Sequence, residues 1–420
     1  MKVYDLKIYD LEEAFGLTLE NLNLDHKELA IDDLELEFKK GDKPLVWLIH
    51  DEAKEAKLTY CVNQVSGLGQ SAEKVTYLDS SRDEPLDLPD FILNRIEDKG
   101  IRVINTGQAG WQDHILPLPD KKWRVNVLGL GDVGGTLLTG LRLMGHGTIS
   151  EIGLFDLDSK RRRRWALELG QILDPNIKDY PTIREVEMDD LFDCDMFVFC
   201  ASRSVPQVGS NVSDVRMIQY ESNSKIIVPY AKMARDKGFK GIFAVVSDPV
   251  DQLCYRVFKS SNLNDEGQFD GRGLKAEQVR GYGLGVMFAR ASYYAQCHGI
   301  PFSNGRAYGP HGKDLVVVND PQNYDEAISQ TLTDLTVKAN LEVREAGYKP
   351  FIAPALSSGA LSLINTMNGN WHDSAIMMGG VYIGCRNRLT NNGLEVERQP
   401  MKTGVVKRLE HVVKVLKAYV

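Results

Sequence analysis

Short apolar runs and acidic loops alternate through the first third of the chain. Strand-like runs lie at 43–50, 57–62 and 100–105, and the segment ends in a proline-rich stretch, Leu116–Asp120. Apolar runs bounded by polar turns are typical of β-strands, and proline-rich stretches are typical of linkers. The pattern predicts a small N-terminal α/β domain over residues 1–122, to which it assigns no role.

From Trp123 onward, apolar strands alternate with helix-like segments. The runs 195–200 and 241–246 are almost continuously apolar, which is typical of strands that are buried on both faces of a parallel sheet. Parallel strands need crossover connections, and right-handed crossovers place helices on both faces of the sheet. We therefore predict a Rossmann-type, doubly wound parallel sheet over residues 123–262.

Long helical patterns dominate the remainder of the chain, with glycine-rich segments between them. One pattern covers 325–346. In a second pattern, near the C-terminus, apolar residues recur at helical spacing: Val405, Leu409, Val412, Val413 and Leu416. These patterns predict an α+β domain over residues 263–420. The expected fold class is therefore α/β, with this domain after the Rossmann sheet and a smaller α/β domain before it.

A glycine-rich turn follows the first apolar strand of the predicted sheet. The strand runs into Gly129-Leu-Gly131-Asp-Val-Gly134, and a helix-compatible segment begins there. In a G-x-G-x-x-G turn, the first glycine permits the tight turn, the second lets the backbone approach a pyrophosphate, and the third lets the helix and strand pack closely. The unpaired N–H groups of the helix N-terminus attract the phosphates. This spacing predicts a dinucleotide site.

An acidic residue, Asp156, ends the second apolar run of the sheet, where a carboxylate would accept hydrogen bonds from a ribose. Its negative charge, with that of Asp158, disfavours a 2′-phosphate, so we expect NAD rather than NADP as the cofactor. The predicted cofactor contacts are Gly129, Gly131, Asp132, Val133, Gly134, Asp156 and, after a later strand, Ala201 and Ser202.

Charge and composition exclude several classes of function. The net charge of −8 is concentrated in the N-terminal part, because 25 acidic and 15 basic residues precede Trp123. The one dense basic run, 160–164, is short, so we expect no nucleic-acid partner. The six cysteines lack metal-ligand spacing, and we expect no metal. No run approaches the roughly 18 apolar residues of a membrane span, and the N-terminus lacks a leader pattern, so we expect a cytoplasmic protein.

Polar residues at the ends of the later strands supply candidate chemistry. Asp248 follows a buried strand, at the sheet edge where α/β proteins bind ligands. His311 lies between Gly309 and Gly312 after an apolar stretch, and Arg290 lies in an apolar helical segment. A histidine can transfer a proton, and arginines can bind carboxylates with two hydrogen bonds. Two further arginines, Arg203 and Arg216, follow the strand that ends at Cys200.

From Trp123 to the C-terminus, the chain resembles the lactate and malate dehydrogenase family. The glycine turn and Asp156 are in place, and the family's N-P-V-D appears as Asp248-Pro-Val-Asp. The catalytic G-x-H-G appears as Gly309-Pro-His311-Gly, and Arg290 matches the arginine of the family's D-x-x-R. Individually these matches are modest, but their order and spacing are specific.

The resemblance implies a role for each of these polar residues. It implies that Arg290 binds the substrate carboxylate at C1 and that Arg216 polarises the carbonyl. It further implies that Arg203 binds a distal carboxylate, as in malate dehydrogenases, and that His311 exchanges the proton. The segment Ile352–Ser357 also resembles the malate type.

This sequence departs from the family pattern at the aspartate that orients the catalytic histidine, where Met287 stands. The family's asparagine is replaced by Asp248, and the loop between Pro206 and Arg216 is longer than the family's. A methionine cannot accept a hydrogen bond from an imidazole as a carboxylate does. One carboxylate has therefore been lost near His311 while another has appeared, and Asp248 is the candidate to orient the imidazole.

Two functions remain open on the sequence. The first is an NAD-dependent 2-hydroxy acid dehydrogenase of malate or lactate type, acting on a small 2-hydroxy or 2-oxo acid, with His311, Arg216 and Asp248 as catalytic residues and Arg203, Arg216 and Arg290 as substrate-binding residues. The second is a catalytically impaired NAD-binding protein with a regulatory or scaffolding role. The resemblance also implies a homodimer or homotetramer.

Overall fold

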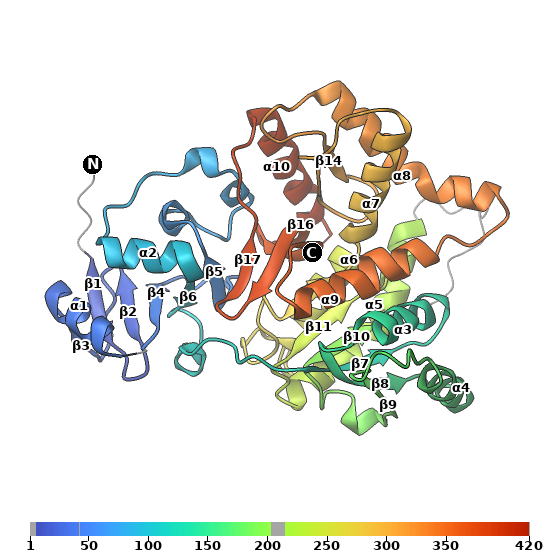
Figure 1. Ribbon diagram of the computed structural model, residues 1–420, viewed down its shortest axis with the longest axis horizontal. Helices are drawn as coiled ribbons and strands as arrows, with labels where there is room; N and C mark the ends of the chain where they lie inside the picture. The colour runs from blue at the N-terminus through green and yellow to red at the C-terminus, as the bar shows by residue number, and fades with distance from the viewer. Residues whose placement is uncertain (1–5, 42, 203–214, 420) are drawn as a thin grey trace.

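The computed structural model describes residues 6–41, 43–202 and 215–419, and it describes side chains in the last segment from residue 218 onward. A single 15-stranded sheet runs through the molecule, and a separate two-stranded sheet accompanies it. Figure 1 shows the N-terminal strands at the left, the parallel strands at the lower right and the C-terminal helices above them. None of the described helices is long and apolar enough to cross a membrane.

Six parallel strands form the Rossmann part of the sheet, in the order β9-β8-β7-β10-β11-β12. This is the strand order 3-2-1-4-5-6 of the doubly wound fold, which confirms the predicted fold class. The strands are β7 (Trp123–Leu128), β8 (Ile149–Phe155), β9 (Thr182–Glu185), β10 (Met196–Phe199), β11 (Ile242–Val245) and β12 (Val279–Gly281). The last strand lies beyond the predicted boundary at 262, because a short loop-rich segment separates it from the preceding helix.

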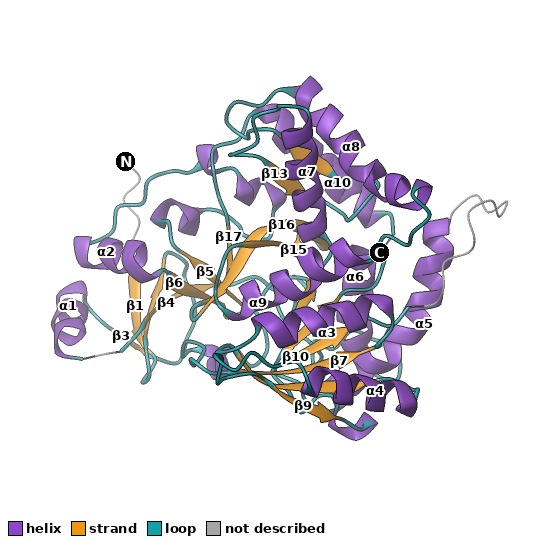
Figure 2. Cartoon of the chain, turned by 45° about the vertical axis from the view of Figure 1, so that its right-hand side comes forward, coloured by secondary structure: helices purple, strands orange, loops and turns teal. Residues whose placement is uncertain are grey.

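Helices cover both faces of these strands, as Figure 2 shows. They are α3 (Asp132–Met144), α4 (Ser159–Gly170), α5 (Val215–Asp236) and α6 (Val250–Ser261). Successive strand residues alternate between two cores: Val198 packs on the α3 side, whereas Phe197 and Phe199 pack on the α5 and α6 side. Burial on both faces explains why β10 and β11 are apolar at every position.

The C-terminal part combines helices with an antiparallel extension of the sheet. Strand β15 (His372–Met378) pairs antiparallel with β12, and β16 (Val381–Thr390) and β17 (Gly393–Val396) follow it. The remaining elements are α7 (Leu284–Cys297), β13 (Arg306–Tyr308), β14 (Val316–Val318), α8 (Glu326–Glu345), a π-helix (Pro354–Leu361), α9 (Ser362–Met367) and α10 (Thr403–Lys417). The helices expected over 325–346 and 405–416 are α8 and α10.

The N-terminal part is a mixed α/β unit whose six strands continue the main sheet in the order β3-β1-β2-β4-β6-β5. Its elements are β1 (Lys7–Asp10), β2 (Phe15–Thr18), β3 (Lys27–Glu28), α1 (Ile31–Lys40), β4 (Leu45–Ile49), β5 (Thr59–Val62), α2 (Asp90–Lys99) and β6 (Ile101–Asn105). Strand β5 pairs in parallel with β17 at Cys61 and Glu395. Trp47 and Leu409 belong to one hydrophobic core, so this unit is packed onto the C-terminal part rather than tethered to it.

Candidate active site

The glycine-rich turn joins β7 to α3 at the carboxyl end of the central strand. Gly129 has a φ of +93°, a conformation that favours glycine, and a Cβ there would lie 2.6 Å from the backbone nitrogen of Ala201. A Cβ on Gly134 would overlap the carbonyl oxygen of Gly129. Both glycines are therefore required by the close packing of the turn against α3 and the end of β10.

Gly131 is the glycine that leaves room for a ligand. No heavy atom lies within 4 Å of the position its Cβ would occupy, and the residue is the N-cap of α3. Asp132 and Val133 open the helix behind it, so their N–H groups belong to the unpaired first turn. The open space beside helical N–H donors fits a dinucleotide pyrophosphate.

Asp156 follows β8 and lies beside this turn. Its carboxylate accepts hydrogen bonds from the N–H groups of Leu130 at 2.9 Å and Asp158 at 3.0 Å, and it pairs with Arg161 at 3.2 Å. Burial raises the pKa of Asp156, but these backbone donors and Arg161 outweigh it, so the pKa is lowered. The carboxylate is thus ionised, and its unused lone pairs can accept ribose hydroxyls.

The remaining predicted cofactor residues, Ala201 and Ser202, follow β10 next to the turn. Ser247, which follows β11, donates its hydroxyl to the carbonyl oxygen of Ala201 at 2.6 Å. This bond ties together the chain segments after two adjacent parallel strands. Both segments therefore lie at the carboxyl edge of the sheet, where α/β proteins bind ligands.

Asp248 and His311 meet beside this edge. Oδ1 of Asp248 lies 3.0 Å from Nδ1 of His311, and the backbone N–H of His311 donates to Asp251 at 3.3 Å. The His311 side chain is 14% exposed and that of Asp248 is 46% exposed. Asn223 of α5 donates to the backbone carbonyl of Asp248 at 2.7 Å. The imidazole is therefore held by a carboxylate that is itself fixed at its backbone.

Flanking glycines shape the loop that carries His311 between β13 and β14. Gly309 has a φ of +86° and Gly312 a φ of +133°, so both adopt conformations that favour glycine. Gly309 exchanges backbone hydrogen bonds with Gly384 of β16. A Cβ on Gly283 would lie 2.9 Å from that of His311, so α7 begins directly against the histidine.

Arg290 projects from α7 and has neutral hydrogen-bond partners. Its guanidinium donates to the side-chain oxygen of Asn340 in α8 and to the sulfur of Met287 at 3.6 Å. Among the described residues it forms no ion pair. Burial lowers the pKa of Arg290, and the nearby charges of Tyr294 and Asp248 oppose that shift. Arg290 lies on α7, the helix that begins directly against His311.

Met287 is buried, with 1% of its surface exposed, and its sulfur contacts Arg290. The hydrogen bonds of the described residues connect His311 to Asp248 and Asp251. Thus position 287 supplies no carboxylate to the imidazole. Asp248 lies within hydrogen-bond distance of His311, as it must if it orients the imidazole.

Two predicted site residues cannot be placed. Arg203 lies outside the described residues, and the side chain of Arg216, at the start of α5, is not described. Three contributors were not predicted: Asp251, Asn223 and Asn340. Asp251 lies inside the D-P-V-D segment, so its spacing was a usable signal. Asn223 and Asn340 lie within helices and carry no local signal.

Comparisons with known proteins found chains of similar sequence. Residues 123–270 match the family model described as lactate/malate dehydrogenase, NAD binding domain. The L-lactate dehydrogenase of Bacillus caldotenax is 30% identical over 193 residues, which are 45% of this chain and 55% of that protein. The L-lactate dehydrogenase of Geobacillus sp. (strain WCH70) is 26% identical over 322 residues, which are 70% of this chain and 94% of that protein. In the first of these pairs, the chain spans only about half the length of its relative.

Solved structures share the fold at lower identity. A lactate dehydrogenase from a Medee basin deep-sea metagenome library has a TM-score of 0.59 and 20% identity, covering 71% of this chain and 98% of that one. The malate dehydrogenase of Archaeoglobus fulgidus, solved in complex with NADH, has a TM-score of 0.57 and 19% identity, covering 70% and 98%. The matched domain and the fit of the turn at Gly131 confirm the predicted cofactor, NAD.

Proposed function

We propose that this chain, whose residues 123–270 match the model of the lactate/malate dehydrogenase NAD-binding domain, is an NAD-dependent dehydrogenase of small 2-hydroxy acids. One observation carries the proposal: the 3.0 Å contact between Asp248 and His311. A carboxylate on one imidazole nitrogen fixes the tautomer and stabilises the imidazolium, as a proton-transferring histidine requires. Asp248 thus compensates for the absence of a carboxylate at Met287.

In this proposal, His311 exchanges the proton of the substrate hydroxyl. With Nδ1–H donating to Asp248, Nε2 is the nitrogen that takes up or releases the proton. When the oxo acid is reduced, protonated Nε2 gives its proton to the carbonyl oxygen. When the hydroxy acid is oxidised, neutral Nε2 takes that proton back. The Asp248 carboxylate stabilises the positive charge while the imidazole holds the proton.

Arg290 binds the substrate carboxylate in this proposal. Its guanidinium is half-buried and has only neutral partners, Asn340 and Met287, among the described residues. A half-buried guanidinium without an anion is unfavourable, so a carboxylate that binds through two hydrogen bonds would be favoured there. By resemblance, we assign the polarisation of the carbonyl to Arg216 and the distal carboxylate of a malate-like substrate to Arg203.

Gly129, Gly131 and Gly134 would hold the NAD pyrophosphate at the N-terminus of α3, and Asp156 would accept from a ribose. The bound nicotinamide supplies hydride transfer. The carboxyl edge of the sheet carries both this turn and Asp248, so one edge serves the cofactor and the proton-transferring histidine. By family resemblance we also propose a homodimer or homotetramer in the cytoplasm.

The test is turnover by the 420-residue chain. Mixing it with NADH and a panel of 2-oxo acids that includes pyruvate and oxaloacetate should oxidise NADH, and the nicotinamide absorbance reports the rate. NADH binding, measured separately by calorimetry, distinguishes an active dehydrogenase from a catalytically impaired NAD-binding protein. NADH binding without turnover of any oxo acid would contradict the proposal and favour an NAD-binding protein without dehydrogenase activity.

A further inference from the structure

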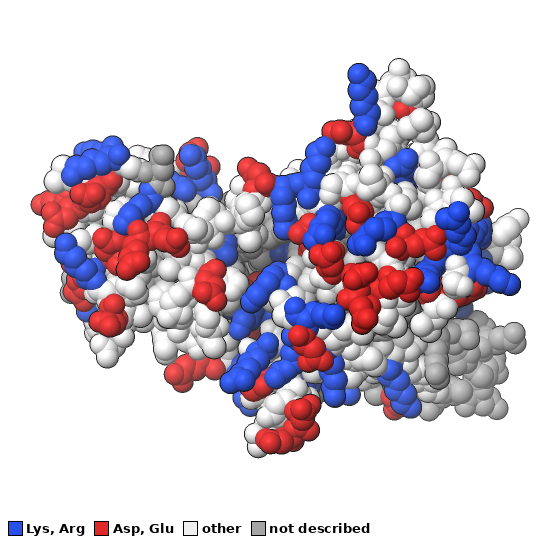
Figure 3. All heavy atoms as spheres, turned by 90° about the horizontal axis from the view of Figure 1, so that it is seen from below, with Lys and Arg blue, Asp and Glu red and all other residues white. Residues whose placement is uncertain are grey.

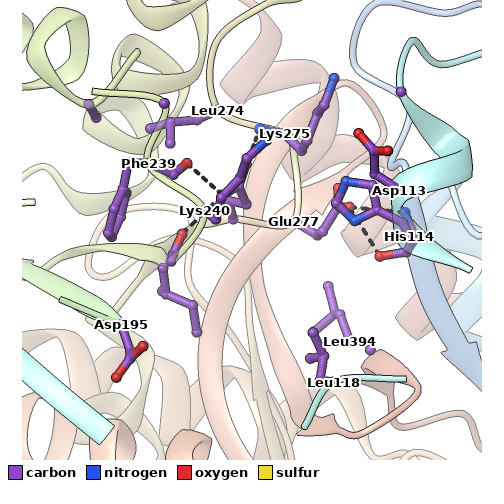
Figure 4. A pocket seen from close by; sticks show the side chains of 18 of the residues that line it. Asp113, His114, Leu118, Asp195, Phe239, Lys240, Leu274, Lys275, Glu277 and Leu394 are labelled. Atoms are coloured by element: carbon purple, nitrogen blue, oxygen red, sulfur yellow. Dashed lines mark hydrogen bonds between the residues drawn. The ribbon is translucent and has the colours of Figure 1, made fainter. Parts of the chain in front are cut away.

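A cavity lies where the N-terminal part meets the Rossmann sheet, at the amino ends of β10 and β11. Its volume is about 290 Å³, and its walls come from β5, β6, the linker around 109–123, the end of α5 and the loop before β12. Figure 4 shows Asp113 and His114 on one side, Phe239, Lys240 and Leu274 on the other, and Glu277 between them. The glycine turn and Asp248 lie at the opposite, carboxyl edge of the sheet, so this cavity is distinct from the proposed active site.

The cavity is lined by more cations than carboxylates. Among the described residues, five lining cations form no ion pair: Arg102, Lys240, Arg272, Lys275 and Arg280. The other two, Lys121 and Arg235, pair with Asp195 and Asp270 at 2.6 Å. Figure 3 shows lysine and arginine side chains gathered near the junction between the N-terminal part and the rest of the molecule.

Two buried guanidinium groups in this wall have unused donors. Arg102 is 3% exposed and Arg280 is 1% exposed, yet Nη1 of each has no hydrogen-bond partner among the described residues. Their Nε atoms donate only to backbone carbonyls, of His114 at 2.7 Å and Glu277 at 3.4 Å. Buried, unsatisfied charged donors are destabilising, and an anion that accepts from them would remove that cost.

One lining carboxylate, Glu277, already accepts hydrogen bonds from the N-terminal part. It accepts hydrogen bonds from the backbone N–H groups of Leu58 at 3.2 Å and Thr59 at 2.9 Å, and it forms no ion pair among the described residues. Burial raises the pKa of Glu277, although these bonds act against the shift. The two lining carboxylates that form no ion pair among the described residues, Asp113 and Glu277, do not balance five cations.

The pKa shifts of His114 and Lys275 reflect the same excess of positive charge. Burial lowers the pKa of His114, and the charges of Arg102, Lys240 and Lys275 lower it further against the opposing effect of Asp113. Burial likewise lowers the pKa of Lys275, with Lys240 adding to the shift and Glu277 opposing it. Cations that disfavour one another's protonated forms create a site that favours an anion.

We propose that this cavity binds a small, multiply charged anion, a phosphate ester or a polycarboxylate. The guanidinium groups of Arg102 and Arg280 bind its charged oxygens from the interior, and Lys240 and Lys275 bind from the opening. Phe239 and Leu274 offer an apolar wall to the carbon skeleton of the ligand. Because the lining comes from both residues 59–123 and residues 234–280, the anion holds the N-terminal part against the Rossmann sheet.

The test uses the 420-residue chain saturated with NADH, so that the glycine turn is occupied. Pyrophosphate and citrate are titrated separately by calorimetry, with sodium chloride at equal ionic strength as the screening control. We expect one of them to bind with a dissociation constant below about 1 mM, and to raise the melting temperature. Pyrophosphate binding indicates a phosphate ester as the natural ligand, and citrate binding indicates a polycarboxylate.

Variants locate the site. Lys240→Gln and Lys275→Gln should each weaken binding by about tenfold, while Lys338→Gln on the exposed surface of α8 should leave it unchanged. Lys240 is exposed and forms no salt bridge with any described residue, so its replacement preserves the fold. Binding of neither anion, or binding that Lys240→Gln and Lys338→Gln leave equally strong, would overturn the proposal whatever the outcome of the dehydrogenase assay.

Discussion

His311 and Asp248 lie 63 residues apart in the chain, yet Nδ1 of the imidazole is 3.0 Å from Oδ1 of the carboxylate. The contact joins the loop before β14 to the segment after β11. It supplies His311 with the carboxylate that Met287 cannot provide, and it leaves Met287 to pack against Arg290. The proposed catalytic pair thus arises from a carboxylate on a different element from the one the family resemblance implies.

Gly131→Ala should weaken NADH binding by at least about tenfold, or roughly 1.4 kcal/mol. The added methyl group meets no protein atom within 4 Å, so the fold should be unaffected, but it occupies the space expected to hold the pyrophosphate. Gly170→Ala is the matched control, because a Cβ there also meets no atom and lies at the end of α4. Calorimetry with both variants checks this; equal NADH affinity in both would place the cofactor elsewhere.

Wild-type protein should bind NADH at least about tenfold more tightly than NADPH, roughly 1.4 kcal/mol, and Asp156→Asn should narrow that preference. The carboxylate repels a 2′-phosphate and neutralises Arg161 through their 3.2 Å ion pair. In Asp156→Asn the side-chain amide still accepts a hydrogen bond from the N–H of Leu130, but it no longer forms an ion pair with Arg161. Titrating each variant with both cofactors measures the ratio. An unchanged ratio would show that Asp156 does not face the ribose.

Arg290→Gln should raise the KM for the 2-oxo acid by about tenfold to a hundredfold, the range expected when a charged hydrogen bond is lost. NADH affinity should stay constant, because the guanidinium contacts α8 rather than the glycine turn. Arg163→Gln on the exposed face of α4 is the control. Steady-state kinetics decides the question: a KM equal in both variants would remove Arg290 from the substrate site.

Asp373→Asn should stabilise the protein more at pH 8 than at pH 5. Burial raises the pKa of Asp373 from 3.8 to about 6, with Arg386 opposing the shift. Because the folded carboxyl keeps its proton to higher pH than the unfolded one, stability is lost as pH rises from about 4 to about 6, and by about 1 kcal/mol between pH 5 and pH 8. An amide does not titrate and avoids this loss.

Urea unfolding of wild type, Asp373→Asn and the exposed control Asp189→Asn at both pH values measures the difference. The gain in unfolding free energy from Asp373→Asn should grow with pH, whereas Asp189→Asn should show no such trend. A gain that is equal at pH 5 and pH 8 would mean that Asp373 is ionised throughout in the folded protein.

The Rossmann sheet was predictable because its signals are local. The glycines of the β7–α3 turn are dictated by contacts within a few residues, as the overlap between a Cβ on Gly134 and Gly129 shows. Full burial made β10 and β11 apolar throughout. The strand β12 was missed, because three residues within an irregular segment carry no periodic signal.

The rest of the site depends on long-range packing. Asn340 reaches Arg290 from a helix 50 residues further along the chain, and nothing in its neighbourhood distinguishes it from an ordinary helical asparagine. The N-terminal part was predicted as a small α/β domain. In the structure its strand β5 pairs with β17, and Trp47 lies in the same hydrophobic core as Leu409. The N-terminal and C-terminal parts therefore bury apolar side chains against each other. Neither relationship leaves a periodic pattern in the sequence.

The central claim is that the Asp248 carboxylate makes His311 a competent proton donor. The direct measurement is kcat for oxo acid reduction at saturating NADH in wild type, Asp248→Asn and the exposed control Asp189→Asn, with NADH affinity confirming the fold. Asparagine keeps the shape but removes the charge, so we expect kcat to fall by at least about tenfold, or roughly 1.4 kcal/mol of barrier, in Asp248→Asn alone. A wild-type kcat in Asp248→Asn would contradict the account.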